Sequence, residues 1–236
     1  MNKEVGVSTG IFYKFYEEEE LNRKISHISR WNIDRIEILF SRLFMLDIPL
    51  SGENKTFLKK KKVTLHAPFF NNEGYDFCKL SREEIRKLVK IGKEINAEYI
   101  IIHPDLLEDA AMLKEFDFPF VFENVKKDIN EEFCLENLEK SFKLNPNLGL
   151  ALDLSHAESL SNEKIKGYIK KYCNLKEIHI SIKEQTSFLE GERQNFQNFL
   201  DQEVNFILES RPRSMDKMHL IIKRLKEILN EDEKGL

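Results

Sequence analysis

The sequence predicts an α/β protein that forms a single (β/α)8 TIM barrel over residues 1–236. Three observations lead to this prediction. Eight short apolar runs of strand-forming residues recur along the chain, amphipathic helical patterns lie between them, and the runs are apolar on both faces. Strands that are buried on both faces and alternate with helices favour a closed parallel barrel over an open sheet.

The spacing of the predicted strands matches a repeated unit of one strand and one helix. From Thr9 to Glu209 the seven steps average about 29 residues, which is the length of a strand, a covering helix and two loops. The eight runs are VGVST (5–9), RIEILF (35–40), VTLH (63–66), YIIIH (99–103), FPFVFE (118–123), LGLALD (148–153), EIHIS (177–181) and VNFILE (204–209).

Two helical patterns are the clearest in the chain. The segment SREEIRKLVKIGKEI (81–95) begins with Ser81 as the predicted N-cap, and Glu84 completes a capping box. Its apolar positions 85, 88, 89, 91 and 95 lie on one helical face. The segment SMDKMHLIIKRLKEIL (214–229) has the same character and predicts the last helix of the barrel.

Other segments are less regular. Only about 20 residues separate the ends of the fourth and fifth predicted strands, so the helix between them must be short. The charged runs EEEE (17–20) and KKKK (59–62) are interpreted as solvated faces of helices or loops.

Composition limits the class of protein. The chain is 41% hydrophobic and 33% charged, which is typical of a globular protein, and no run of about 18 apolar residues could cross a membrane. No signal peptide is visible, so we expect a cytoplasmic protein. The formal charge of −4 disfavours nucleic acid as a partner. The three cysteines lack CxxC spacing, which argues against a thiolate metal site.

The ends of the predicted strands carry an unusual set of side chains. In such a barrel the carboxyl ends of the strands meet at one rim, so residues far apart in sequence become neighbours. Imidazoles and carboxylates gathered at one rim suit a divalent metal such as zinc, manganese or cobalt. The set comprises Glu37, His66, His103, Glu123, Asp153, His179 and Glu209, with His156 just beyond the sixth strand.

Each of these residues also has a purely structural interpretation. A lone histidine at a strand end is often a hydrogen-bonded framework residue, and a lone glutamate there can cap the next helix. His27 and His219 lie in helical patterns and are expected to be surface or packing residues. Trp31 and the stretch FFNNEGYDF (69–77) could line a pocket, but core or loop packing is the favoured interpretation.

Short motifs at the strand ends resemble those of the xylose isomerase-like TIM-barrel superfamily. They are HAPF (66–69), HPD (103–105), FEN (122–124), DLSH (153–156), HIS (179–181) and ILE (207–209), and their order and spacing span nearly the whole chain. The superfamily contains sugar and sugar-phosphate isomerases and epimerases, and also the endonuclease IV family of apurinic-site nucleases.

The isomerase and epimerase branch implies one set of roles. By this resemblance Glu123, Asp153, His179 and Glu209 hold one divalent metal, and Glu123 and Glu209 also act as the catalytic acid and base. A metal-stabilised enediolate connects the two sugar isomers in such a reaction. His156 matches a substrate contact of the epimerases, and Arg193 and Glu37 are further predicted substrate contacts. The expected partner is a small carbohydrate.

The nuclease branch implies a larger metal site. There His66, His103 and Glu123 hold a zinc ion, and Glu123, Asp153, His179 and Glu209 hold a second. The segment SFLEGERQNF (187–196) departs from that branch, because Glu192, Arg193 and Gln194 stand where its third-zinc motif is expected. The leading hypothesis is therefore a metal-dependent isomerase or epimerase. A zinc-dependent apurinic-site endonuclease and a barrel without catalytic activity are the two alternatives.

Overall fold

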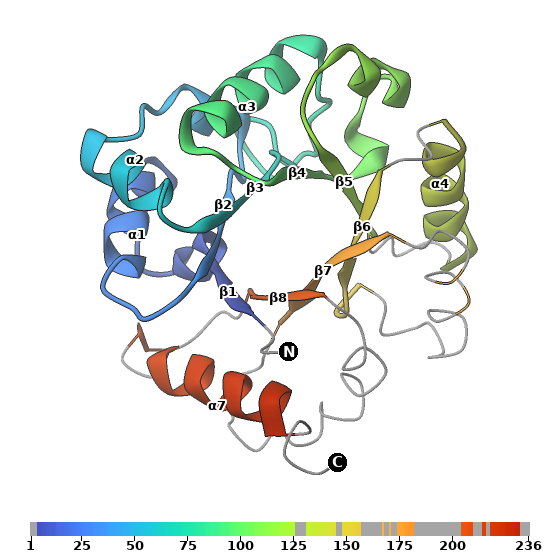
Figure 1. The fold of residues 1–236 in the computed structure, drawn as a ribbon. Helices are drawn as coiled ribbons and strands as arrows, with labels where there is room; N and C mark the ends of the chain where they lie inside the picture. The colour runs from blue at the N-terminus through green and yellow to red at the C-terminus, as the bar shows by residue number, and fades with distance from the viewer. Residues whose placement is uncertain are drawn as a thin grey trace.

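Eight parallel strands form a closed barrel in the order β1-β2-β3-β4-β5-β6-β7-β8. The structure is a computed structural model that describes residues 4–125, 131–144, 148–156, 167, 170, 174–181, 204–209, 214–215 and 218–231. The barrel closes where β1 pairs with β8, with Val5 beside Phe206 and Val7 beside Leu208. Figure 1 shows the ring of strands inside a layer of helices. The predicted (β/α)8 TIM barrel is confirmed.

Every predicted apolar run overlaps an observed strand. The strands are β1 Val5–Ser8, β2 Arg35–Leu39, β3 Lys62–His66, β4 Tyr99–Ile102, β5 Phe120–Glu123, β6 Gly149–Asp153, β7 Leu175–Ile180 and β8 Asn205–Leu208. Most observed boundaries differ from the predicted ones by one or two residues. The differences arise because strand ends depend on backbone pairing with neighbours, which a single sequence does not show.

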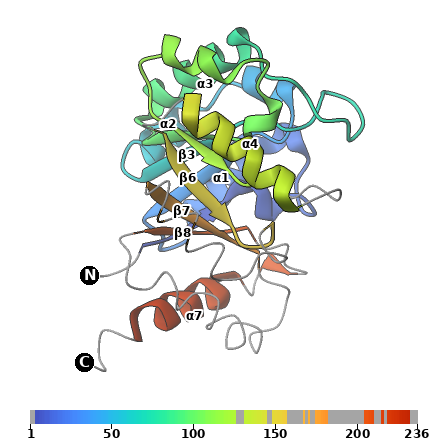
Figure 2. The same cartoon turned by 90° about the vertical axis from the view of Figure 1, so that its right-hand side faces the viewer.

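The described helices pack outside the barrel, as Figures 1 and 2 show. They are α1 Leu21–Ile28, α2 Gly52–Leu58, α3 Arg82–Ile95, α4 Glu131–Leu144 and α7 Met218–Glu231. The capping box of α3 is confirmed, because Ser81 Oγ accepts from the backbone of Glu83 and Glu84 accepts from the backbone of Ser81. The last helix begins four residues later than predicted.

The connection between β4 and β5 contains 3₁₀ turns rather than an α-helix. These are η4 Pro104–Leu106 and η5 Ala110–Glu115, and the Asp109 side chain caps η5 by accepting from the backbone N–H of Ala111. The connection is short, as predicted, but 3₁₀ turns stand where a short helix of the barrel repeat was expected. Further 3₁₀ turns are η1 Thr9–Phe12, η2 Glu18–Glu20 and η3 Leu43–Asp47.

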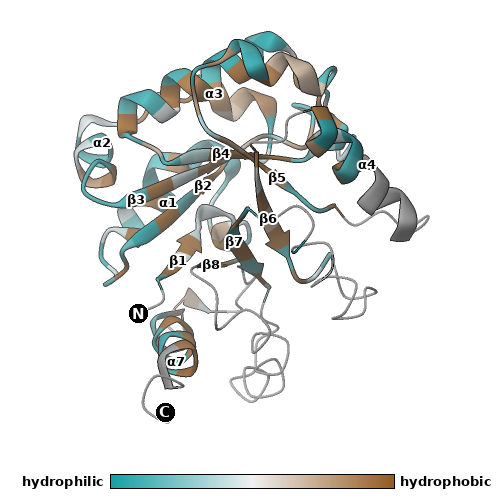
Figure 3. Ribbon diagram, turned by 45° about the vertical axis from the view of Figure 1, so that its right-hand side comes forward, coloured by the Kyte–Doolittle hydropathy of each residue, from teal (hydrophilic) through white to brown (hydrophobic). Residues whose placement is uncertain are grey.

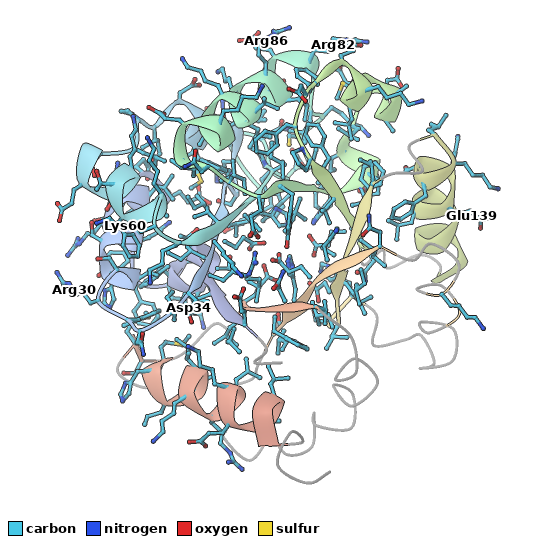
Figure 4. The ribbon with its side chains drawn as sticks, viewed as in Figure 1. Arg30, Asp34, Lys60, Arg82, Arg86 and Glu139 are labelled. Atoms are coloured by element: carbon cyan, nitrogen blue, oxygen red, sulfur yellow. The ribbon has the colours of Figure 1, made fainter. Side chains whose placement is uncertain are left out.

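An apolar layer between strands and helices forms most of the core. Figure 3 shows mainly hydrophobic residues along β1 and β6, and a mixture of hydrophilic and hydrophobic residues along α3. Charged side chains such as Arg82, Arg86 and Glu139 extend away from the barrel in Figure 4. Within the described part of the chain, no helix has both the length and the hydropathy needed to cross a membrane.

The inside of the barrel contains charged and hydrogen-bonding side chains beside a small apolar cluster of Tyr99, Ile101, Val121 and Ala151, whereas aliphatic layers usually fill this fold. Side chains from non-adjacent strands meet there: Tyr99 of β4 donates to Glu177 of β7, and His179 of β7 lies 3.3 Å from Glu37 of β2. Arg35 of β2 is also buried, at 2% exposure. Contacts between strands on opposite sides of a closed barrel can form only through its interior.

Gly6 of β1 leaves the space that the Arg35 side chain occupies. A Cβ atom built at Gly6 would lie 2.5 Å from Ile207 Cδ1 and 2.8 Å from Arg35 Cγ, whereas one built at Gly52 would meet nothing within 4 Å. We therefore expect Gly6→Ala to lower the free energy of unfolding by about 1–3 kcal/mol through overpacking. Urea denaturation of both variants tests this, with Gly52→Ala as the matched control. Equal stability of the two variants would contradict the argument.

Candidate metal centre

Imidazole and carboxylate groups meet at the carboxyl ends of the strands. Within the described residues four groups have candidate ligand atoms that all lie within 4.8 Å of one another. They are His66, His103 and Glu123; Glu37, Glu177 and His179; Glu123, Asp153 and His156; and Asp153, His179 and Glu209. Strands β2 to β8 contribute because the closed barrel brings them together around one interior and one rim.

Two imidazoles converge on a single oxygen of Glu123. His66 Nε2 lies 2.6 Å and His103 Nε2 lies 3.0 Å from Glu123 Oε2. The other nitrogen of His66 is 2.9 Å from the carbonyl oxygen of Ala67, and a carbonyl oxygen can only accept, so Nδ1 of His66 carries a proton. His66 Nε2 is therefore the nitrogen directed at the cluster, as it is in metal-binding histidines whose other nitrogen is held by the protein.

His179 Nδ1 faces a carboxylate from each of two other strands. It lies 3.5 Å from Glu123 Oε1 and 3.6 Å from Glu209 Oε2, and it has no hydrogen-bond partner among the described residues although it is fully buried. A buried nitrogen without a partner costs free energy, and a cation bound among these atoms would remove that cost. The donor set of imidazole nitrogens and carboxylate oxygens fits zinc, manganese or cobalt.

Asp153 is held in place by the side chain of Asn124. The Asn124 amide donates to the carbonyl oxygen of Asp153 and accepts from its backbone N–H, at 2.9 and 2.7 Å. Asp153 Oδ1 accepts from the backbone of Ser155, and Oδ2 lies 3.2 Å from His156 Nδ1. His156 Nδ1 is also 2.9 Å from the carbonyl oxygen of Asn124. Thus the ends of β5 and β6 are fastened together at the cluster.

Burial and neighbouring charges move the pKa values of the cluster in opposite directions. Burial raises the pKa of Glu209 well above its ordinary value, and the negative charges of Glu37 and Asp153 add to this. Burial also opposes ionisation of Glu123, but the positive charges of His103 and His179 prevail and lower its pKa well below its ordinary value. The surroundings in the metal-free protein therefore favour the ionised form of Glu123 and the protonated form of Glu209.

Phe69 forms one wall of the cluster. Its ring stacks on His103 with a centroid distance of 5.8 Å and meets His66 edge-on at 5.9 Å. Phe69 also contacts Phe70, which packs against the exposed rings of Tyr75 and Phe77. The stretch predicted to pack in the core or a loop thus supplies a wall of the candidate site and an aromatic rim beside it.

The structure brings most of the predicted site residues together. His66, His103, Glu123, Asp153, His156, His179 and Glu209 all occur in the groups of candidate ligands. Glu37, a predicted substrate contact, is fully buried and lies 3.3 Å from His179 Nε2. Arg193 lies outside the described residues, as does its whole segment 187–196. His27, away from the cluster, packs against Phe12 and Trp31.

Sequence reasoning missed three residues that shape the site. Glu177 precedes His179 by two, so alternation along a strand already places both side chains on one face of β7. Asn124 follows Glu123 directly and was quoted in a motif, but its clamp on Asp153 depends on the neighbouring strand. Phe69 lies in a loop whose path is not visible in the sequence.

Comparison with solved structures gives the same fold. The AP endonuclease structure AsfvAP:AG aligns with a TM-score of 0.61 at 11% identity over 99% of both chains. The probable 3-DHS dehydratase AsbF from Bacillus anthracis aligns at 0.64 and 10% identity over 96% and 99%. D-allulose 3-epimerase from Methylomonas sp. in complex with D-allulose aligns at 0.58 and 13% identity over 99% and 97%. The resemblance to xylose isomerase-like TIM barrels is confirmed for the fold.

Comparisons at the level of sequence do not identify a family for the chain. No known protein-family profile matches the chain. A glutamate–tRNA ligase from Carboxydothermus hydrogenoformans is 29% identical over 158 residues, which are 65% of this chain but only 30% of the ligase. The chain spans less than a third of that relative, so the match gives no argument for ligase activity.

The metal-free protein should lose stability as the pH rises. Burial opposes protonation of His66, but Glu123 prevails and raises the pKa of His66 to about 9. This stabilisation is complete below the ordinary value of about 6.5 and disappears as the pH rises through 9. We expect the melting temperature of the metal-free chain to fall over this interval.

His66→Gln should flatten this dependence, and the exposed His219→Gln should leave it unchanged. Each pKa unit corresponds to about 1.4 kcal/mol, so the pair contributes at most roughly 3 kcal/mol. Thermal unfolding at several pH values gives the comparison. A wild-type melting temperature that rises from pH 6.5 to 9 would show that the ion pair between His66 and Glu123 is absent.

Proposed function

We propose that the protein is a metal-dependent isomerase or epimerase acting on a sugar, a sugar phosphate or a related hydroxy-carbonyl compound. One observation carries the proposal: two carboxyl groups, Glu123 and Glu209, face the same nitrogen of His179 while their surroundings push their pKa values apart. A pair of carboxyl groups in opposite protonation states is the arrangement that acid–base catalysis requires. The fold likeness to sugar epimerases supports this choice of reaction.

The two carboxyl groups divide the proton transfer. Glu123 would accept the proton from the carbon beside the substrate carbonyl, and Glu209 would act as the acid that delivers a proton to the neighbouring carbon or to the opposite face of the same carbon. A divalent ion held by Glu123, Asp153, His179 and Glu209 would stabilise the negative charge that develops on the substrate oxygens. After one turnover Glu123 has gained a proton and Glu209 has lost one. Proton exchange with solvent returns both groups to their starting states.

Other residues position the reacting groups. Asn124 fixes the backbone of Asp153 through two hydrogen bonds, and the Asp153 carboxylate itself accepts from the backbone N–H and the hydroxyl of Ser155. Phe69 stacks on His103 and excludes water from that side. His156 has 26% of its side chain exposed, so a substrate hydroxyl can reach it from solvent. We propose that His156 orients the substrate, and Arg193 remains a proposed contact from the segment outside the described residues.

Removal of either proton-transfer group should abolish isomerisation. We expect Glu123→Gln and Glu209→Gln each to lower turnover by about 10²–10⁴-fold, the usual contribution of a positioned acid or base. The assay is NMR detection of deuterium incorporated from D₂O next to the carbonyl, with ketoses, aldoses and their phosphates as substrates and manganese, cobalt or zinc added. Glu98→Gln, a carboxylate that pairs with Arg35, is the matched control. Full exchange by a folded Glu123→Gln protein would refute the proposal.

A second candidate is a zinc-dependent endonuclease acting at apurinic sites. The observation that favours it is the group formed by His66, His103 and Glu123, which lies beside the group of Asp153, His179 and Glu209 and could hold a second ion. Two neighbouring ions suit phosphodiester hydrolysis. The exposed rings of Tyr75 and Phe77 are surfaces on which unpaired bases could stack. The fold likeness to AsfvAP is compatible with this candidate.

Metal stoichiometry separates the two candidates. For the nuclease we expect about two zinc ions per chain, one of which is lost in the His66→Ala/His103→Ala protein together with nicking of an abasic duplex. Elemental analysis by mass spectrometry and gel electrophoresis of the duplex are the measurements. His27→Ala, a substitution in the aromatic cluster outside the candidate metal centre, is the control. About one ion per chain and an intact duplex at enzyme excess would eliminate the nuclease.

A further inference from the structure

A buried carboxylate lies directly beneath the candidate metal centre. Glu177 Oε1 is 3.0 Å from His179 Nε2, and Glu177 Oε2 accepts a hydrogen bond from Tyr99 Oη at 3.0 Å. Glu177 and His179 are both completely buried and Tyr99 is 7% exposed. This group has no place in the proton transfer proposed above, because solvent and substrate cannot reach it.

The two nitrogens of His179 have different surroundings. Nε2 is directed at Glu177 and, at a longer 3.3 Å, at Glu37, whereas Nδ1 is directed at Glu123 and Glu209 and has no hydrogen-bond partner in the described structure. A carboxylate can only accept a hydrogen bond, so the contact at Nε2 places the ring proton there. The lone pair of the neutral ring then lies on Nδ1, on the side of the candidate metal.

Glu177 is itself fixed from two directions. The Tyr99 hydroxyl occupies one of its oxygens, and burial together with the charge of Glu177 raises the pKa of Tyr99, so the hydroxyl keeps its proton. Arg35 contributes a buried positive charge that interacts with Glu177 and Tyr99 and is anchored by Glu98 at 2.6 Å. The space for Arg35 depends on Gly6. Three strands therefore support the orientation of one imidazole.

We propose that Glu177 is a positioning residue that holds the proton of His179 on Nε2 and so presents Nδ1 as the metal ligand. The inference rests on the metal centre of the proposed function. Histidines that bind metals usually donate their other N–H to a carboxylate or carbonyl group, and loss of that partner lowers metal affinity about 10–100-fold. Glu37 is a weaker acceptor, because its oxygens lie farther away and make no hydrogen bond within the described residues.

The experiment measures the protonation pattern of the ring and the affinity for metal separately. Long-range ¹H–¹⁵N correlation spectra of histidine-labelled protein report which ring nitrogen of His179 carries the proton, in the metal-free chain at a pH where the ring is neutral. Titration with zinc or cobalt in a calorimeter reports the affinity. The variants are Glu177→Gln and Tyr99→Phe, and Glu94→Gln is the matched control because Glu94 pairs with Lys55 on the outer surface, away from His179.

We expect the proton on Nε2 in the wild type and in Glu94→Gln. Glu177→Gln should populate the form protonated on Nδ1 and bind metal about 10–100-fold more weakly. Tyr99→Phe should change the ring protonation pattern and the metal affinity in the same direction by a smaller factor. This second variant still tests the role of Glu177 if Glu177→Gln folds poorly. Circular dichroism confirms the fold of each variant.

Failure of the inference differs from failure of the proposed function. A wild-type ring protonated on Nδ1, or an unchanged ring pattern and unchanged metal affinity in folded Glu177→Gln, would overturn the role of Glu177 while leaving the metal centre intact. A wild-type chain that binds no metal would overturn the proposed function and with it the ligand role of Nδ1, whatever nitrogen carries the proton.

Discussion

The arrangement of the site depends on the cost of burying several carboxyl groups in one barrel. Glu37, Glu123 and Glu177 are at most 2% exposed, and Glu209 lies at the rim above them. Ionised carboxylates so close together repel one another and lose their hydration, so they must be paired with cations, protonated or bound to metal. The structure uses imidazoles for this: His66, His103 and His179 each contact a buried carboxylate.

The closed barrel makes this compensation feasible. An open sheet would leave the ends of β3 and β8 far apart, whereas closure directs side chains from seven strands at one small volume. Charged and hydrogen-bonded groups continue below the site through Glu177, Tyr99 and Arg35, beside the apolar side chains of Ile101, Val121 and Ala151. An exposed ion pair contributes little free energy, but a buried one that loses a partner leaves an uncompensated charge. The interior is therefore sensitive to single substitutions.

The sequence predicted the strands and the rim residues for a simple physical reason. Parallel strands buried on both faces form continuous apolar runs, and His66, Glu123 and Asp153 each end such a run. What lies across the barrel could not be predicted, because sequence does not show which strands face one another. The contact of Tyr99 with Glu177 joins positions 78 residues apart, and the clamp of Asn124 on Asp153 depends on the register of β5 and β6. The 3₁₀ turns between β4 and β5 form because the connecting segment is short, and no helical pattern in the sequence indicates them.

The same contacts that stabilise the metal-free protein also prepare it for metal. Glu123 raises the pKa of His66, and a cation held by His66 and Glu123 would displace the proton that lies between them. Metal binding would then release a proton, and the affinity for metal is expected to rise as the pH increases towards 9. Because His66 Nδ1 is held by the carbonyl oxygen of Ala67, the ring keeps its orientation in both states. The end of β3 thus fixes the direction of this candidate ligand through a contact with the backbone.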